Sequence, residues 1–172
     1  MNISIKPAML IALTLGVSVA LSAEALKDGS VPLSKNYTHW TVFLKDVQRP
    51  DVKQVRELYV NSVGAKAKEG DAFPLGTTIV MENHEAVPGA DSKLTPGAIV
   101  RIYVMHKIKG TPEGVPDGLQ NGSWVYGSFT ADGKPAVDDF QKCRACHLPL
   151  ASKDYVQRYD DYFKARSANI KP

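Results

Sequence analysis

The only two cysteines of this 172-residue chain stand in one pentapeptide, Cys143-Arg144-Ala145-Cys146-His147. The spacing C-x-x-C-H is the attachment signal for a c-type haem. Two thiols add to the haem vinyl groups, and the next residue offers an imidazole to the iron. The motif uses both cysteines and leaves none over. We therefore predict one covalent haem c, anchored by Cys143 and Cys146, with His147 as an iron ligand.

Other uses of a C-x-x-C pair fit the sequence less well. A structural zinc site needs about four Cys or His ligands, and the remaining histidines lack finger-like spacing; they are His39, His84 and His106. A thioredoxin-type pair would lie beside a βαβ pattern, whereas this motif follows a strand-rich region and precedes a predicted helix. A disulfide across two residues would constrain almost nothing.

The N-terminal segment has the organisation of a secretory signal peptide. Lys6 precedes an apolar run over residues 8–21, and small residues follow, so we expect cleavage after Ser22 or after Ala25. The alternative is an uncleaved anchor, but the run is shorter than the ~20 residues that a spanning helix needs. Since bacterial c-type haem is attached outside the cytoplasm, we expect a periplasmic protein with no membrane span in its mature form.

Residues 26–172 are long enough to form one domain with its own core. The net charge is +3, and the Lys and Arg residues are scattered along the chain. Nucleic-acid binding would need a basic stripe, so we expect no nucleic-acid partner.

Alternation of apolar and polar residues predicts an α+β fold built mainly on an antiparallel sheet of about five strands. The clearest strand is 98–108, with Val100, Ile102, Val104 and Ile108 on one face and Arg101, Tyr103, Met105 and Lys107 on the other. Residues 38–44, 76–82 and 123–129 also read as strands, while 52–60 fits a strand or a helix.

Helical segments are predicted at 64–70, at 137–142 and from about 153 to 166, where Tyr155, Tyr159 and Tyr162 or Phe163 recur at helical spacing. The haem is then attached near the C-terminus of a strand-rich domain. This order argues against small all-helical cytochromes, whose motif lies near the N-terminus, and against a helical cytochrome c′ bundle.

Beyond the haem motif, the chain resembles the cytochrome P-460 family over residues 34–166. The resemblance rests on R-E-L-Y-V-N at 56–61, on F-P-x-G-T-x-I-V-x-E at 73–82, on Trp124 in the last strand and on C-x-x-C-H. It implies a homodimer of mainly β domains, each with one c-type haem and a proximal histidine. In many members the other side of the iron is open to nitric oxide or hydroxylamine.

The chain departs from the family pattern at one position. Hydroxylamine-oxidising members cross-link a lysine to the haem, and the corresponding position here is Met81. A thioether has no amine nucleophile, and the nearest lysines, Lys68 and Lys93, lie outside the predicted strand. Hydroxylamine oxidation by the cross-linked route is therefore disfavoured.

Met81 and Met105 are the only methionines of the expected mature chain, and the resemblance places both near the distal side of the haem. The sulfur of either methionine is a candidate iron ligand, and Met81 is the preferred one. Ligation by His and Met raises the reduction potential of a haem and suits electron transfer. The alternative is that both methionines fill a hydrophobic pocket.

Other polar residues near these strands give weaker predictions. Arg101 is a candidate for hydrogen bonds to a haem propionate, with a solvated or salt-bridged role as the alternative. Strict alternation puts Glu82 and His84 on the strand face opposite to Met81. We therefore expect His84 to be a surface or loop residue, and Glu82 to carry a distal proton only if the strand twists.

Three functions remain, and the sequence does not decide whether the protein is an enzyme. The preferred one is a periplasmic binder of small gaseous or nitrogen-oxide ligands such as nitric oxide. The second is an electron carrier with His147/Met81 ligation and a redox partner protein. The third is oxidation of hydroxylamine or nitric oxide without a cross-link.

Overall fold

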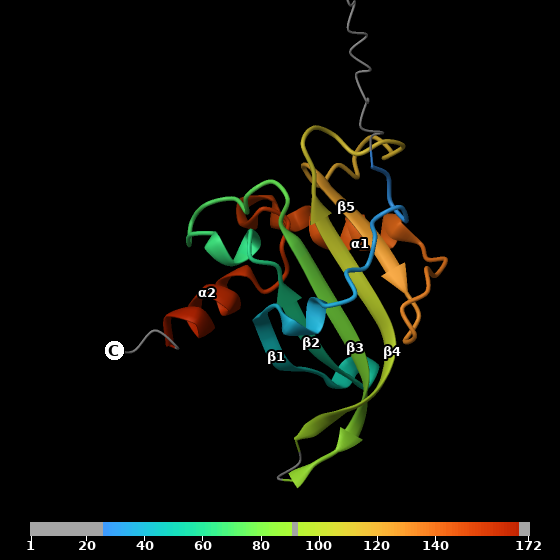
Figure 1. The fold of residues 1–172 in the computed structure, drawn as a ribbon, viewed down its shortest axis with the longest axis vertical. Coiled ribbons are helices and arrows are strands. Elements are labelled where there is room, and N and C mark those ends of the chain that lie inside the picture. Colours follow the sequence, from blue (N-terminus) through green and yellow to red (C-terminus); the bar gives the residue numbers. More distant parts are fainter. Residues whose placement is uncertain (1–25, 91–92, 169–172) are drawn as a thin grey trace, which may run out of the picture.

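A single antiparallel sheet forms the centre of the protein, and its strands lie side by side in chain order, β1-β2-β3-β4-β5 (Figure 1). The structure is a computed structural model and describes residues 26–90 and 93–168. The strands are β1 (Thr41–Arg49), β2 (Gln54–Val60), β3 (Thr78–Pro88), β4 (Leu94–Lys107) and β5 (Trp124–Phe129). Antiparallel neighbours need only short connections, and the predicted α+β fold is confirmed.

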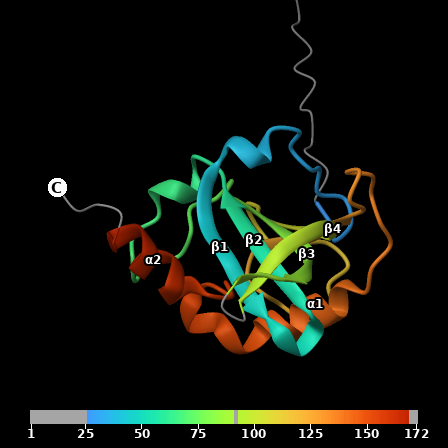
Figure 2. The same ribbon diagram turned by 90° about the horizontal axis from the view of Figure 1, so that it is seen from below.

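Helices lie beside the sheet in two separate groups. They are η1 (Tyr37–His39), η2 (Pro50–Val52), η3 (Gly64–Lys66), α1 (Phe140–His147), η5 (Leu148–Lys153) and α2 (Tyr159–Ala168). Figure 2 shows three layers: the N-terminal segment with η1, the sheet, and the layer that contains α1 and α2. Within the described ranges, no helix has the length and apolar character needed to cross a membrane.

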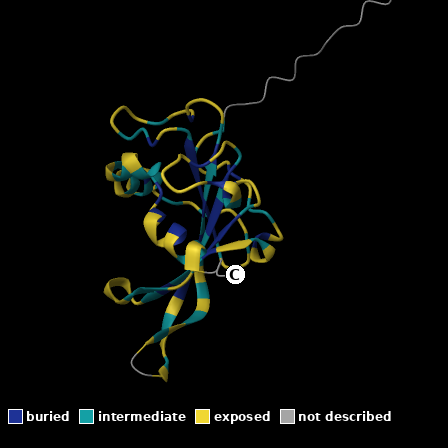
Figure 3. Cartoon of the chain, turned by 90° about the vertical axis from the view of Figure 1, so that its left-hand side faces the viewer, coloured by how far each residue is buried: buried dark blue, intermediate teal, exposed yellow. Residues whose placement is uncertain are grey.

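Each face of the sheet carries its own apolar core, because successive side chains of a strand point to opposite faces. The core beneath α1 and α2, called here the helix-side core, includes Phe43, Leu58, Ile79, Trp124, Tyr159 and Tyr162. The core beneath the N-terminal segment includes Tyr37, Tyr59, Val80, Ile102 and Val104. Figure 3 shows the buried residues concentrated in the body of the sheet, while the far end of the β3–β4 hairpin is exposed or half-buried.

Several predicted boundaries need correction at the strands. The strand expected over 38–44 begins only at Thr41 and continues to Arg49, because the preceding residues form η1. Residues 52–60 fitted either a strand or a helix, and the structure has them as the strand β2 from Gln54 onward. This strand pairs with β1 on one side and with β3 on the other. Val100 was predicted to lie on one face with Ile102, but it is 48 % exposed whereas Ile102 is buried, and the pairing of β3 with β4 shifts register next to it.

The two C-terminal helices also differ from the sequence expectation. The first begins at Phe140 rather than near 137 and contains the C-x-x-C-H motif instead of ending before it. The carboxylate of Asp139 caps this helix by accepting a hydrogen bond from the Gln141 amide at 3.1 Å. The second helix begins at Tyr159, because residues just before it have left-handed backbone conformations. Tyr155 therefore lies in a loop and not in the helix.

Candidate functional site

Helix α1 carries the whole C-x-x-C-H motif and lies against the face of the sheet that holds the helix-side core. Cys143 is half-buried and packs against that core, whereas Cys146 is exposed, and both are free thiols. Burial, followed by the nearby carboxylates, raises the pKa of the Cys143 thiol to about 11. Residues three apart lie on one side of a helix, so both sulfurs are available to one bound group.

His147 is the last residue of α1, and the fold fixes its tautomer. Its Nδ1 atom lies 2.6 Å from the carbonyl oxygen of Tyr155. A carbonyl can only accept a hydrogen bond, so Nδ1 carries the proton and Nε2 keeps its lone pair. Burial lowers the pKa of His147 and favours this neutral form. Metal-ligating histidines characteristically donate their other N–H to such a carbonyl, which suits His147 to bind iron through Nε2.

The loop that supplies the Tyr155 carbonyl is held by hydrogen bonds from residues elsewhere in the fold. Asp154 and Tyr155 have φ of 52° and 59°, an uncommon conformation for residues other than glycine. The Asp154 carboxylate accepts hydrogen bonds from Lys107 Nζ at 2.5 and 2.7 Å and from the Phe73 amide at 2.8 Å. Its carbonyl accepts one from the Trp124 indole at 2.8 Å. These contacts fix the acceptor to which His147 donates.

The orientation of α1 depends on Arg144, the first residue between the two cysteines. Its side chain is 1 % exposed and donates two hydrogen bonds to the Asp28 carboxylate, at 2.7 and 2.9 Å. A third goes to the carbonyl oxygen of Trp124 at 3.1 Å. The helix that carries the motif is therefore tied both to the N-terminal segment and to β5.

The structure places both candidate methionines on the sheet face against which Cys143 of α1 packs. Met81 pairs with Leu58 on one side and with Tyr103 on the other, and Met105 pairs with Ile79 and Tyr126. Both methionines are half-buried and pack against the helix-side core, as Cys143 does. Their common face follows from the strand register, and bonding of either sulfur to iron stays a prediction.

Arg101 belongs to a polar row that crosses three strands on this face. It pairs with Asn83, which in turn pairs with Arg56 on β2. Among the described residues, the buried Nε of Arg56 and Oδ1 of Asn83 have no hydrogen-bond partner. Burial, reinforced by the charge of Arg49, lowers the pKa of the Arg56 guanidinium.

The residues on this face fit a haem. Buried polar atoms without a partner cost about 1–3 kcal/mol each, so the Nε–H of Arg56 is suited to donate to a bound polar group such as a haem carboxylate, whereas Oδ1 of Asn83 can only accept and needs a donor. The hydroxyl of Tyr126, whose ring lies 5.4 Å from that of His147, is a third such atom. Sequence reasoning missed Arg56 and Asn83, although alternation from Met81 would have placed Asn83 on its face.

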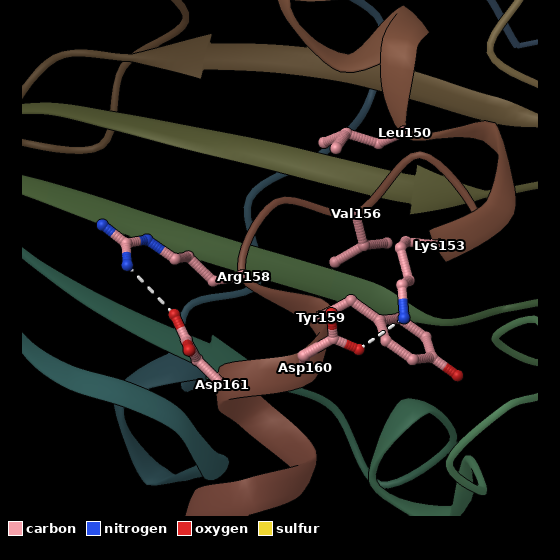
Figure 4. A pocket seen from close by; sticks show the side chains of 7 residues that line it. All are labelled: Leu150, Lys153, Val156, Arg158, Tyr159, Asp160 and Asp161. Carbon is pink, nitrogen blue, oxygen red and sulfur yellow. Dashed lines mark hydrogen bonds and ion pairs between the residues drawn. The ribbon is translucent and has the colours of Figure 1, made fainter.

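A surface hollow beside the motif is a different feature and contains none of the predicted haem residues. Figure 4 shows its lining, which comes from η5, the following loop and the start of α2. Two exposed ion pairs cross it, Lys153 with Asp160 at 2.6 Å and Arg158 with Asp161 at 3.0 Å. Its charged, open lining is unlike a haem crevice.

His84 is the clearest error among the predicted polar residues. It was expected at the surface or in a loop, but it lies in β3 and is 8 % exposed. Its ring bonds to Glu82 and to the Gly97 carbonyl, partners that the fold brings to it. Glu82 lies on the face opposite to Met81, as alternation predicted, where it accepts a hydrogen bond from Tyr37 at 2.6 Å.

A mainly antiparallel sheet that leads into a C-x-x-C-H helix defines a cytochrome of β architecture, distinct from the all-helical classes. Over residues 34–158 the sequence matches the family model for cytochrome P460, and the chain belongs to that family. No curated protein matches the chain. Membership confirms the resemblance stated above and identifies the chain as a haem-binding cytochrome.

Proposed function

We propose that this protein is a periplasmic cytochrome with one covalent haem c held by Cys143, Cys146 and His147. In this proposal it binds a small neutral ligand such as nitric oxide on the Met81 side. The support is the family membership, the two free thiols on α1 and the His147 tautomer. When bound, the haem supplies an iron at which a diatomic gas can coordinate.

The observation that carries this proposal is the apolar surface that extends from Met81 toward Ile79. Its members on this face are Leu58 and Tyr103 across the strands from Met81, Ile79 along β3 and Met105 diagonally, while the polar row begins at Asn83 on the other side of Met81. Thioether and hydrocarbon groups disfavour charged ligands, because an ion would lose its hydration there. Neutral gases lose little hydration in the same surroundings, so this wall selects for them.

The position of Glu82 argues against an oxidation that needs a nearby proton acceptor. Its carboxylate lies across the sheet from Met81 and accepts a hydrogen bond from Tyr37. The general base of a proton transfer must come within hydrogen-bond reach of its substrate. Oxidation of hydroxylamine or nitric oxide would therefore require another base on the helix side.

Arginine side chains of the polar row have a separate role in the proposal. Arg56 and Arg101 flank Asn83 on the same face as the methionines. Guanidinium groups bind carboxylates through paired, charge-assisted hydrogen bonds. We assign them to the haem propionates, which extends the original prediction for Arg101 to Arg56.

An electron carrier is the second candidate, because Met81 lies on the face that holds the motif. If its sulfur bound the iron together with His147, the reduction potential would rise and gas binding would be blocked. Met105, on the same face, is the alternative ligand. A redox partner protein is expected for either function.

Optical spectra of the haem-loaded protein distinguish the two candidates. They are recorded oxidised and reduced, with and without nitric oxide and carbon monoxide, for the wild type, Met81→Leu and Met105→Leu. A high-spin spectrum that shifts promptly with gas, unchanged in both variants, supports gas binding. A low-spin spectrum that ignores carbon monoxide, and becomes high-spin only in Met81→Leu, shows ligation by Met81 and overturns the first proposal.

Export to the periplasm is part of the proposal, although the expected signal peptide, residues 1–25, lies outside the described residues. Cleavage after Ser22 or Ala25 would leave Asp28 in the mature chain, where it pairs with Arg144. Mass spectrometry of the exported protein would identify the new N-terminus and the single haem. A homodimer, implied by the family resemblance, is checked by light scattering of the same sample.

A further inference from the structure

A second group of ionisable side chains lies on the face of the sheet opposite to the haem motif. Glu57 in β2 and Glu82 in β3 are direct cross-strand partners, and His84 follows two residues further along β3. Carboxylate oxygens of the two glutamates and a ring nitrogen of the histidine all lie within 4.8 Å of one another. Glu82 is 4 % and His84 8 % exposed, while Glu57 is half-buried.

The charges of this group are not balanced by a lysine or arginine. Two carboxylates directly opposite each other in a sheet repel, and burial makes an uncompensated charge costly. Within the described part of the chain, the only ion-pair partner of Glu82 is His84, at 3.0 Å, and Glu57 has no ion-pair partner. The pair of glutamates therefore requires a source of positive charge.

The hydrogen bonds of His84 indicate that the positive charge lies between its ring and Glu82. Its Nδ1 lies 2.9 Å from the carbonyl oxygen of Gly97, which can only accept, so Nδ1 carries a proton. Its Nε2 lies 3.0 Å from Oε2 of Glu82. In the neutral ring, the lone pair of Nε2 then faces a carboxylate oxygen. Either a second proton or a metal ion must lie between them.

The surrounding hydroxyls favour the metal ion. Tyr37 donates to Oε1 of Glu82 at 2.6 Å, and Tyr59 donates to Oε2 of Glu57 at 2.9 Å. Each carboxylate thus has one oxygen held by a tyrosine, while the second oxygen of Glu82 faces Nε2 of His84, and Gly97 holds the ring of His84 in the same way. Outer contacts of this kind orient metal ligands. A second proton on His84 would supply one positive charge to two carboxylates, whereas a divalent ion would supply two.

We propose that Glu57, Glu82 and His84 bind one divalent transition-metal ion, of which Zn²⁺ is the probe to use. One imidazole and two carboxylates form a nitrogen–oxygen donor set that suits Zn²⁺ or Mn²⁺, whereas Ca²⁺ and Mg²⁺ prefer oxygen ligands alone. The half-buried Glu57 gives the ion its route from solvent. This site is separate from the haem, because Cys143 packs on the other face of the sheet.

Equilibrium dialysis of the mature, haem-loaded protein against Zn²⁺, followed by elemental analysis, tests this site. The haem iron content gives the number of protein molecules, so the wild type is expected to hold about one Zn per Fe. His84→Gln and Glu57→Gln are expected to weaken Zn²⁺ binding at least about tenfold. The matched control is His106→Gln, which removes a histidine that bonds to Thr78 and lies outside the cluster; it should bind as the wild type does.

The variants keep the proposal falsifiable even if one of them does not fold. Should His84→Gln unfold, Glu57→Gln at the half-buried side decides the question. Equal Zn²⁺ binding by the wild type and Glu57→Gln would overturn the proposal. A folded wild type that takes up no Zn²⁺ would also overturn the proposal. His84 and Glu82 would then form an ion pair without a metal ion. Zn²⁺ is expected to leave the haem spectrum unchanged, which separates this result from that of the gas-binding test.

Discussion

The Nδ1 atom of His147 donates a hydrogen bond to the carbonyl oxygen of Tyr155 across 2.6 Å. The bond joins the last residue of α1 to a loop whose backbone is left-handed at two consecutive residues, Asp154 and Tyr155. Such a loop persists only where surrounding contacts hold it. Here the contacts come from Lys107, Phe73 and Trp124. The orientation of the predicted iron ligand thus depends on residues remote from the motif.

Replacing Asp154 with Ala should therefore destabilise the protein strongly. The change leaves Lys107 buried without its carboxylate, and breaking a buried ion pair typically costs about 3–5 kcal/mol. Urea unfolding measures the loss in free energy of unfolding. Asp160→Ala, which breaks an exposed pair with Lys153, is the control and should change little. Equal stability of the two variants would contradict the structural role of Asp154.

Arg144→Met tests the link between the haem helix and the N-terminal segment. The variant keeps the apolar length of the side chain but removes the hydrogen bonds of Arg144 to the Trp124 carbonyl and to Asp28, which keeps only the Tyr126 amide as a donor. We expect a loss of about 3 kcal/mol or more, seen as a lower melting temperature. Arg158→Met removes an exposed arginine of the same type and serves as the comparison. A melting temperature no lower than that of Arg158→Met would show that the Asp28 contact is dispensable.

Alternation explains what the sequence predicted correctly. Each face of the sheet packs against another layer, so a period of two within β3 places Met81 on one face and Glu82 on the other. C-x-x-C-H specifies its chemistry through local spacing alone. Neither inference requires contacts between distant parts of the chain.

The errors arose where contacts between distant parts of the chain decide the structure. Tyr155 continues the helical spacing of the aromatic residues, but a buried network holds it in a left-handed turn. The sequence predicts a surface position for His84, because it does not show that the fold brings the carbonyl of Gly97, 13 positions away, to the His84 ring. The row of Arg56, Asn83 and Arg101 exists only through strand register, which composition does not specify.

His106 is expected to make the protein less stable in acid. Burial lowers its pKa below the ordinary value of 6.5. The unfolded chain then binds more protons than the folded one as the pH falls below 6.5, so the free energy of unfolding decreases there. The slope for one group is at most about 1.4 kcal/mol per pH unit. Urea unfolding between pH 8 and pH 5 should give a flatter profile for His106→Gln, and identical profiles would exclude the effect.

Arg56→Met distinguishes a haem-binding arginine from a merely buried one. Without haem, the Nε of Arg56 is buried and has no partner among the described residues, so replacing it with an apolar side chain should stabilise the fold by about 1 kcal/mol. With haem attached, the variant should lose the proposed contact with a propionate and become less stable than the wild type. The measurement compares urea unfolding of both forms, with the haem-free form made in a Cys143→Ser, Cys146→Ser background. A change of the same sign in both forms would mean that Arg56 makes no contact with the haem, whereas a reversal of sign would assign it to the site.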